Sequence, residues 1–327
     1  MPVLKVTNRA MHTTPLPPAI FLMGPTASGK TDLAVELTRL LPCDIISADS
    51  ALIYTGMDIG TAKPDTDTLA HAPHRLISFV DPAETYSAAA FRRDALQHMA
   101  DITAQGRIPL IVGGTMLYFK ILRDGIAELP AADPDIRQQL SAEATRLGWP
   151  AMHARLAEQD PESAAKLHPN HSQRILRALE VYAQTGTPLS VLQRAASSAP
   201  LPYRLSQLGL LPIDRSALEA RIKQRLNVML DNGLVDEVKR LHARGDLHTG
   251  LPSMRSVGYR QVWDMLEGQF PPERLRDKIQ HATMQLAKRQ ITWLRSWPEL
   301  ITVAIHYPLA RQEVINRILK TLSENAP

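Results

Sequence analysis

The sequence predicts an α/β protein in which a parallel sheet is interrupted by an all-helical domain. Three observations lead to this prediction. An apolar run at residues 19–23 leads into a glycine-rich loop and then into a helix. Short apolar runs alternate with helical segments over much of the remaining chain, which is typical of a parallel sheet. Residues 130–202 break this alternation with helical segments alone.

Residues 24–31 read GPTASGKT, in which two glycines separated by four residues precede a Lys and a hydroxyl residue. The backbone N–H groups of such a loop, together with the N-terminus of the following helix, form an anion site. We expect Lys30 to add a positive charge there and Thr31 to ligate Mg2+ through its hydroxyl. The core is therefore predicted to be P-loop NTPase-like. The predicted diphosphate- or nucleotide-binding residues are Gly24, Pro25, Thr26, Ala27, Ser28, Gly29, Lys30 and Thr31.

The elements that follow continue this pattern. Apolar spacing predicts a helix over residues 32–41, which Pro42 ends. A short buried strand around Ile45 and Ile46 comes next and ends near Asp49. Further strands are expected at residues 75–80, 108–113, 207–213 and 300–306, with a helix over residues 87–105.

Residues 130–202 contain helical runs punctuated by prolines and no convincing strand. The segment is far too long for one crossover helix in a compact sheet. We interpret it as a helical domain inserted into the sheet, and such a domain can close over a site as a lid. Its helical runs are expected at residues 136–147, 152–158, 173–184 and 189–195.

After this insertion a long helical pair is expected from Asp214, where Ser216 and Glu219 have the spacing of a capping box. A last amphipathic helix over residues 277–297 ends before Pro298. The expected organisation follows from these elements. It comprises a flexible N-terminal extension at residues 1–18, a P-loop α/β core at residues 19–129 and 203–327 with basic C-terminal helices, and a helical insertion at residues 130–202.

Composition indicates a globular protein of the cytoplasm. Hydrophobic residues make up 44% and charged residues 21%, and the single cysteine, Cys43, excludes an internal disulfide framework. No apolar run has membrane-spanning length, and the first 18 residues lack the apolar core of a secretion signal. Residues 201–327 carry 19 Lys and Arg against 13 Asp and Glu. This excess of positive charge is a weak indication of a polyanionic partner, since an ordinary solvated face can have the same composition.

Two polar side chains are expected beside the phosphate loop. Asp49 follows the second parallel strand, and the carboxyl ends of parallel strands share one edge of the sheet. A carboxylate there can bind Mg2+ or act as a base, or it can simply cap the next turn. The strand at residues 108–113 is followed by Gly114 and Thr115 instead of the Asp that an NTPase often places there, which argues mildly against ordinary ATP hydrolysis. The predicted catalytic residues are Asp49, Thr115 and Lys30.

Three basic segments leave two interpretations open, a surface for RNA or a solvated and structural role. Residues 173–177 (QRILR) open an amphipathic helix whose Arg174 and Arg177 are expected to face outward. Residues 254–260 (MRSVGYR) carry two arginines around a small core. Residues 288–295 (KRQITWLR) combine basic, amide, hydroxyl and aromatic groups that suit RNA phosphates and unstacked bases, although Trp293 can equally pack in a core. His168 and His171 have no third ligand nearby in the sequence, so we assign no metal to them.

Seven motifs occur in order between residues 20 and 297: GPTASGKT, DSALIYTGMDIGTAKP, DPAETYSAAAFRRDA, GGTMLYFK, HPNHSQRILRALEVY, MRSVGYRQVW and KRQITWLR. With these motifs the chain resembles the tRNA dimethylallyltransferases, the isopentenyl-tRNA transferase family, over nearly all of its folded length. That family moves a dimethylallyl group from dimethylallyl diphosphate to N6 of the adenine on the 3′ side of the anticodon. The resemblance implies that the phosphate loop holds a prenyl diphosphate, although its pattern is also that of an ATP site.

The resemblance further implies Mg2+ as cofactor, the anticodon stem-loop of tRNA as partner, and an insertion domain that contacts tRNA; we also expect a monomer without membrane contact. Ala51 and Leu52 stand where many relatives carry a glutamine. Two rival functions remain, a P-loop kinase for a small metabolite and an RNA-binding module with a vestigial phosphate loop. The residues expected to contact tRNA are Asp49, Ser50, Ala51, Leu52, Thr115, Arg137, Gln173, Arg174, Ile175, Leu176, Arg177, Arg255, Ser256, Val257, Gly258, Tyr259, Arg260, Lys288, Arg289, Gln290, Ile291, Thr292, Trp293, Leu294 and Arg295.

Overall fold

The computed structural model describes residues 16–127, 129–195, 201–306 and 311–324. These residues divide into two compact units, one within Met1–Phe119 and Pro202–Pro327 and the other within Lys120–Leu201. We call them the α/β unit and the helical unit. Most of the predicted extension at residues 1–18 lies outside the described residues, and its last residue already belongs to the first strand.

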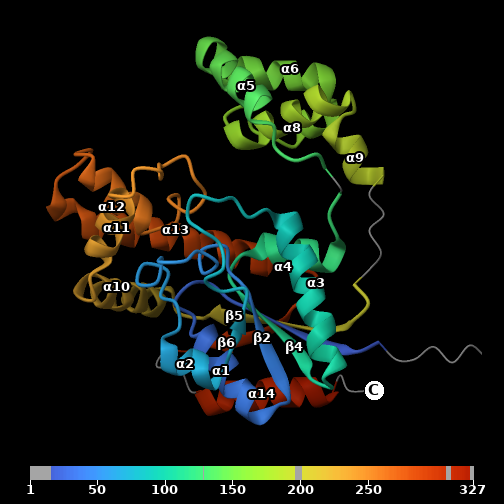
Figure 1. Ribbon diagram of the computed structural model, residues 1–327. Helices are drawn as coiled ribbons and strands as arrows, with labels where there is room; N and C mark the ends of the chain where they lie inside the picture. Colours follow the sequence, from blue (N-terminus) through green and yellow to red (C-terminus); the bar gives the residue numbers. More distant parts are fainter. Residues whose placement is uncertain (1–15, 128, 196–200, 307–310, 325–327) are drawn as a thin grey trace, which may run out of the picture. The chain divides into compact units, whose positions relative to one another are not determined.

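Among the described residues the α/β unit contains a six-stranded sheet in the order β3-β2-β4-β1-β5-β6 (Figure 1). Every pair of neighbouring strands is parallel. The predicted α/β class with a parallel sheet is therefore confirmed. The strands are β1 Pro18–Met23, β2 Cys43–Ala48, β3 His74–Arg75, β4 Ile108–Gly113, β5 Arg204–Pro212 and β6 Ile301–Ile305.

Helices cover both faces of this sheet (Figure 1). Ile20 and Leu22 of β1 belong to a buried cluster with side chains of α1 and α14, whereas the ring of Phe21 packs edge-on against Phe119 of α4. This alternation is what a strand buried on both faces requires. The helices are α1 Lys30–Leu40, α2 Thr66–His71, α3 Ala88–Ala104, α4 Met116–Asp124, α10 Arg215–Asp231, α11 Leu234–His242, α12 Tyr259–Leu266, α13 Leu275–Arg295 and α14 Arg311–Glu324, with a 3-10 turn η1 at Pro272–Arg274.

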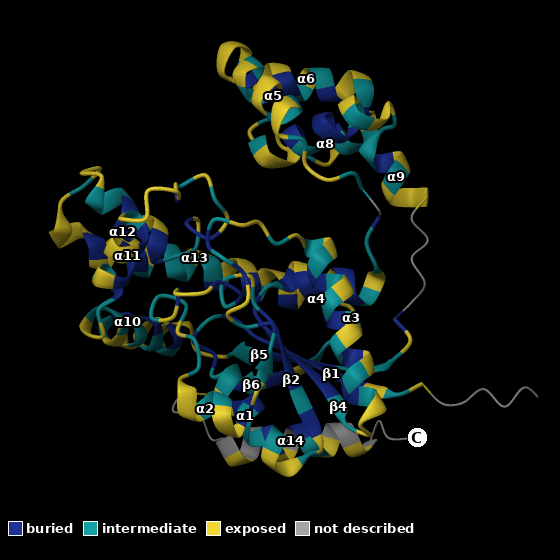
Figure 2. Ribbon diagram, viewed as in Figure 1, coloured by how far each residue is buried: buried dark blue, intermediate teal, exposed yellow. Residues whose placement is uncertain are grey.

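The helical unit has its own core and no strand among its described residues. Its most buried helix is α8, against which α5 and α6 pack (Figure 2). The core includes Leu140, Met152, Leu156, Ile175 and Leu179, each at most 4% exposed. Its helices are α5 Pro134–Leu147, α6 Trp149–Gln159, α7 Pro161–Ala165, α8 Ser172–Thr185 and α9 Leu189–Ala195.

Three local expectations were wrong. The predicted strand at residues 75–80 stops at Arg75, because Leu76 and Ser78 have φ of 62° and 53°, which no strand tolerates. The predicted final helix is followed by a further one, α14, whose Ile315 and Ile318 are buried against the sheet. Helix α10 is capped by Asp214, whose carboxylate accepts a hydrogen bond from the backbone N–H of Ser216 at 2.8 Å, and not by Ser216 itself.

Candidate functional site

The carboxyl ends of three adjacent strands lie level with one another. Met23 of β1 and Ala48 of β2 are both in register with Gly113 of β4. The phosphate loop, Asp49 and Thr115 therefore emerge at one edge of the sheet, which is where ligands bind in open α/β folds. A pocket of about 480 Å³ lies at this edge, and all the residues that line it belong to the α/β unit.

The phosphate loop enters α1 through Gly29, whose φ of 85° is left-handed and favours glycine at this position. Helix α1 begins at Lys30, so the first backbone N–H groups of the helix are directed at the pocket mouth without intrahelical partners. The side chains of Lys30 and Thr31 line the pocket beside them. The local geometry is that of an anion site with a hydroxyl at its edge.

The pocket concentrates positive charge that is partly removed from solvent. Burial lowers the pKa of Lys30 to about 8, the Asp49 carboxylate opposes this shift, and the Arg225 guanidinium adds to it. The pKa of Arg225 is likewise lowered, mainly by burial. One carboxylate thus faces two partly buried cations, and an anionic ligand would relieve the imbalance.

Arg221 and Arg225 of α10 were not among the predicted site residues. Arg225 donates to the carbonyl of Thr61 at 3.1 Å, and Arg221 donates from Nε to the carbonyl of Ala27, in the phosphate loop, at 3.0 Å. A usable signal was present in the sequence, because the two arginines are one helical turn apart beside the apolar stripe that contains Ile222. What the sequence could not show is that this helix packs against the phosphate loop.

Ser50 links the turn that carries Asp49 to Thr115. Asp49 accepts a hydrogen bond from the N–H of Ala51 at 3.0 Å, while the Thr115 hydroxyl accepts from the N–H of Ser50 at 3.0 Å and donates to the Ser50 hydroxyl at 3.2 Å. The turn after β2 is therefore fixed by the loop after β4. Asp49, Ser50, Ala51 and Thr115 all line the pocket.

Gln290 of α13, predicted to contact tRNA, lines this site and is buried. It is 8% exposed, and its side-chain oxygen accepts from the N–H of Thr26 at 2.8 Å. Its side-chain nitrogen donates to the carbonyl of Gly114 at 2.9 Å. The amide thus bridges the phosphate loop and the loop after β4, and its polar groups are used inside the protein.

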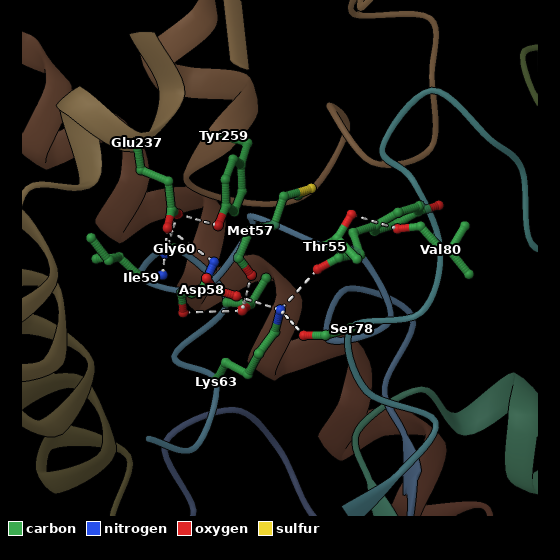
Figure 3. Close-up of polar contacts among 12 residues, drawn as sticks. Thr55, Met57, Asp58, Ile59, Gly60, Lys63, Ser78, Val80, Glu237 and Tyr259 are labelled. Carbon is green, nitrogen blue, oxygen red and sulfur yellow. Dashed lines mark hydrogen bonds and ion pairs between the residues drawn. The ribbon is translucent and has the colours of Figure 1, made fainter. Parts of the chain in front are cut away.

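Residues 60–62 line the pocket, and Glu237 of α11 holds the segment 57–63 that carries them. Figure 3 shows its carboxylate facing the backbone N–H groups of Ile59 and Gly60 and the Tyr259 hydroxyl. It accepts hydrogen bonds from them at 2.9, 3.1 and 2.5 Å, respectively. On the other side Lys63 donates to the Tyr54 carbonyl and to Ser78. These contacts fix the segment whose Thr61 carbonyl holds Arg225.

Tyr259 is therefore structural, which corrects its prediction as a tRNA contact, whereas Gly258 lines the pocket and its predicted tRNA contact stays a prediction. Tyr259 is fully buried, and its ring fills the space above Gly60, where an added Cβ would lie 2.5 Å from the ring. Gly258, with φ of 95°, begins α12 in a conformation that favours glycine. Of the same motif, Arg255 and Arg260 are exposed, and Arg260 pairs with Asp264.

The pocket also has an apolar lining beside its charged groups. Ile222 and Leu226 of α10 contribute to it, and so do Ile279 and Leu286 of α13. Val257, from the segment of the chain that connects α11 to α12, also lines the pocket. A ligand with an anionic head and a short hydrocarbon tail matches this polarity.

On α13 the basic residues face solvent. Lys288, Arg289, Thr292 and Arg295 are exposed, and the Trp293 side chain is 37% exposed, so it does not pack in the core. Ile291 is half-buried, and Leu294 is 1% exposed and belongs to the core, which corrects its prediction as a tRNA contact. The exposed set is a cationic surface with one aromatic ring.

On α8 the arrangement differs. Gln173 and Arg174 are exposed, but Ile175 and Leu176 are at most 5% exposed and belong to the core of the helical unit. Arg177 turns inward and does not face outward as predicted. It donates to Glu180 at 2.9 Å and to the carbonyl of Pro130 at 2.6 Å.

Arg137 of α5 shares the same partner, donating to the buried Glu180 at 3.3 Å. Its side chain is 41% exposed, so one face of the guanidinium remains open to solvent. The two arginines and the carboxylate form an internal cluster of the helical unit. The Arg177 guanidinium is therefore already bound inside the helical unit, and its predicted contact with tRNA would require these bonds to be shared or broken.

Among the described residues no group of three or more His, Cys, Asp and Glu side chains is placed to hold a metal ion. In the same part of the chain, no helix combines the length and apolarity that crossing a membrane requires.

Comparison with known proteins identifies the family. The family model described as IPP transferase matches residues 52–297. A protein of Thioalkalivibrio sulfidiphilus named tRNA dimethylallyltransferase is 62% identical over 282 residues, which is 86% of this chain and 88% of that protein.

Solved structures agree. The full-length tRNA isopentenylpyrophosphate transferase of Bacillus halodurans has a TM-score of 0.68 and 34% identity, covering 94% of this chain and 97% of that one. The tRNA delta(2)-isopentenylpyrophosphate transferase of Staphylococcus epidermidis has a TM-score of 0.67 and 32% identity, covering 95% and 100%. A eukaryotic dimethylallyltransferase acting on tRNA shares the fold, with a TM-score of 0.80 at 23% identity over 95% and 80% of the two chains. The chain belongs to the IPP transferase family.

Proposed function

We propose that this protein is a tRNA dimethylallyltransferase of the cytoplasm. It transfers a dimethylallyl group from dimethylallyl diphosphate to N6 of the adenine on the 3′ side of the anticodon and releases diphosphate. The single observation that carries the proposal is the pocket at the sheet edge, where an anion site, one carboxylate and an apolar wall converge. The named relatives supply the substrate pair.

The diphosphate binds at the start of α1. The helix N-terminus, the Lys30 ammonium and the Arg225 guanidinium surround it, and the two cations are the groups whose pKa values burial has lowered. As the allylic C–O bond breaks, negative charge grows on the departing diphosphate, and these groups stabilise it. The hydrocarbon tail lies against the apolar side of the pocket, which excludes water from the cationic carbon.

Asp49 accepts the proton. The adenine amino group is a weak nucleophile because its lone pair is delocalised into the ring. As the bond from N6 to the allylic carbon forms, the N6 proton moves to the Asp49 carboxylate, which accepts a hydrogen bond from the N–H of Ala51. Thr115 fixes the same turn through Ser50. The products are the N6-substituted adenine, diphosphate and one proton, which Asp49 holds and then releases, so charge and protons balance.

The residues present fit a magnesium ion that shares the diphosphate. Magnesium is commonly held by one or two carboxylates plus substrate phosphates, so it needs no all-protein cage. Thr31 and Asp49 offer a hydroxyl and a carboxylate at the pocket, and the buried Ser47 hydroxyl there has no partner among the described residues. The ion would supply charge neutralisation on the leaving group.

The tRNA anticodon arm lies on the exposed cations of the α/β unit, and the helical unit adds contacts. Arg255 and Arg289 line the pocket as well as facing solvent, so they stand where a base would enter. The target adenine has to leave its base stack before its N6 amino group can contact Asp49. The Trp293 ring offers a surface on which nearby bases can stack.

The proposal is tested by incubating the full chain with labelled dimethylallyl diphosphate, unmodified tRNA and Mg2+. The expected product is tRNA that carries the label on the adenine beside the anticodon, with stoichiometric diphosphate. A matched tRNA with guanine at that position should stay unlabelled. Phosphorylation of a metabolite from ATP, or tRNA binding without any transfer, would contradict the proposal and support a kinase or a binding module.

A further inference from the structure

Three backbone donors within residues 24–28 of the phosphate loop are used inside the protein. The N–H of Gly24 donates to the carbonyl of Gly113 at 3.3 Å, and the N–H of Ser28 donates to the carbonyl of Pro25 at 3.2 Å. Pro25 has no N–H to offer. The N–H of Thr26 donates to the side-chain oxygen of Gln290 at 2.8 Å. These donors are therefore not directed at a ligand.

The orientation of the Gln290 amide is determined by its two partners. The Thr26 N–H can only donate, so it requires the amide oxygen, while the Gly114 carbonyl can only accept, so it requires the amide nitrogen at 2.9 Å. The close approach needs a glycine, because a Cβ at Gly114 would lie 2.4 Å from Nε2 of Gln290. The second glycine of the GGT motif thus makes room for this contact.

The consequence for ligands is a short anion site. The donors left to a ligand are concentrated at the start of α1, around Lys30 and Thr31. In phosphate loops of this pattern, the backbone donors and the Lys extend along a chain of successive phosphates. A third phosphate would reach the first half of the loop, where the Thr26 donor is already occupied and the Gln290 oxygen presents partial negative charge.

We propose that Gln290 is a specificity-determining residue that restricts the phosphate loop to diphosphates and excludes triphosphates. This inference rests on the proposed function, since it explains how a loop with an ATP-type pattern selects a prenyl diphosphate. It also separates the loop from that of a kinase without any change in the GPTASGKT motif. The selecting residue lies 264 positions away in the sequence and reaches the loop only through the fold.

The test measures the affinity of inorganic pyrophosphate and of tripolyphosphate by calorimetry, with the full chain at fixed free Mg2+. The wild-type protein should bind pyrophosphate at least about 10-fold more tightly than tripolyphosphate, because the longer anion loses one hydrogen bond to a charged group. In Gln290→Ala the Thr26 donor is released, and the affinity ratio of tripolyphosphate to pyrophosphate should rise by about 10-fold or more. Gln285→Ala, an exposed glutamine on the same helix, should leave the ratio unchanged.

Two further variants keep the test decisive. Gln290→Glu still accepts from Thr26 and adds negative charge, so its ratio should stay at or below the wild-type value. Gly114→Ala displaces the Gln290 amide from the other side, so its ratio should rise, and it decides the matter if Gln290→Ala does not fold. Equal affinity of wild type for both anions, or an unchanged ratio in folded Gln290→Ala and Gly114→Ala, would overturn the inference. These measurements use neither tRNA nor a prenyl donor, so absence of prenyl transfer would overturn the proposed function separately.

Discussion

Two charged groups, Glu180 in the helical unit and Lys30 in the α/β unit, differ in how their charge is compensated. In the helical unit the Glu180 side chain is 0% exposed and accepts from Arg177, from Arg137 and from the N–H of Asp133 at 3.0 Å. In the α/β unit Lys30 is only partly buried and lies near one carboxylate and a second cation, and desolvation lowers its pKa to about 8.

The difference separates a structural charge from a functional one. Removing one partner of a fully satisfied buried charge is costly, because it leaves the other partner unpaired. An incompletely compensated buried cation destabilises the empty protein and stabilises a complex with an anion. We therefore expect substitutions at Glu180 to affect folding, and substitutions at the pocket to affect ligand binding and turnover.

The largest expected effect is on turnover, in Asp49→Asn. The amide keeps the shape of the side chain but cannot accept the N6 proton, so turnover should fall about 100- to 10,000-fold while tRNA affinity is retained. Single-turnover prenyl transfer and tRNA binding measured on the same preparation check this. Thr115→Ala, which loosens the Ser50 contact, should show a smaller defect. Normal turnover of Asp49→Asn at neutral pH would exclude Asp49 as the base.

The corresponding loss in the helical unit is one of stability. Glu180→Ala leaves two arginines and a backbone N–H without their acceptor, and should cost about 3–5 kcal/mol of unfolding free energy. Urea unfolding checks this, with exposed Glu158→Ala of the same unit as the matched control. Pyrophosphate affinity should not change in Glu180→Ala. An unfolding free energy equal to that of the control would show that the cluster is not structural.

Diphosphate binding at the pocket should depend on pH through the Lys30 side chain. The pKa of Lys30 in the ligand-free protein is about 8, and the charged form binds diphosphate. As pH rises through about 8 the free protein loses this proton, so affinity for dimethylallyl diphosphate should fall, and binding at pH 8.5 should take up a proton, at most about one per site. Calorimetry in two buffers of different ionisation enthalpy measures the uptake. In Lys30→Arg this loss of affinity should be absent below pH 10, since Arg stays charged.

The smallest expected effect is on the salt dependence of tRNA binding, and it distinguishes Lys288 of α13 from Arg177 of α8. Lys288→Ala removes an exposed cation, so the slope of log affinity for tRNA against log salt should decrease by roughly 0.7 to 0.9. Arg177→Ala should change this slope little, because its guanidinium is already bound to Glu180 and Pro130, and should lower stability instead. Equal slope changes in both variants would show that Arg177 contacts tRNA phosphates as Lys288 does.

The sequence predicted the parts of the site that local pattern determines. The phosphate loop, Asp49 after β2 and Thr115 after β4 follow from chain order, because parallel strands end at one edge. It could not predict Arg225 or the bridging role of Gln290. Both reach the pocket through helices that pack across the sheet edge, and no local spacing records such packing.

The errors on α8 and α12 have a related cause. Sequence spacing places Arg177 and Tyr259 on helices, but it does not identify a buried carboxylate that draws a side chain inward. Glu180 and Glu237 do so here, and both are polar residues that a simple hydrophobic pattern assigns to solvent. The predicted strand at residues 75–80 failed for a backbone reason, since positive φ at Leu76 has no signature in its side chain.

The most direct test of the contrast between structural and functional charge is Lys30→Met, studied for stability and for diphosphate binding together. The substitution keeps the length of the side chain and removes a cation that burial disfavours. At pH 7 the account predicts a melting temperature at or above that of the wild type, together with a loss of dimethylallyl diphosphate affinity of about 100-fold. A fall in melting temperature like that of Glu180→Ala, with diphosphate affinity preserved, would contradict it.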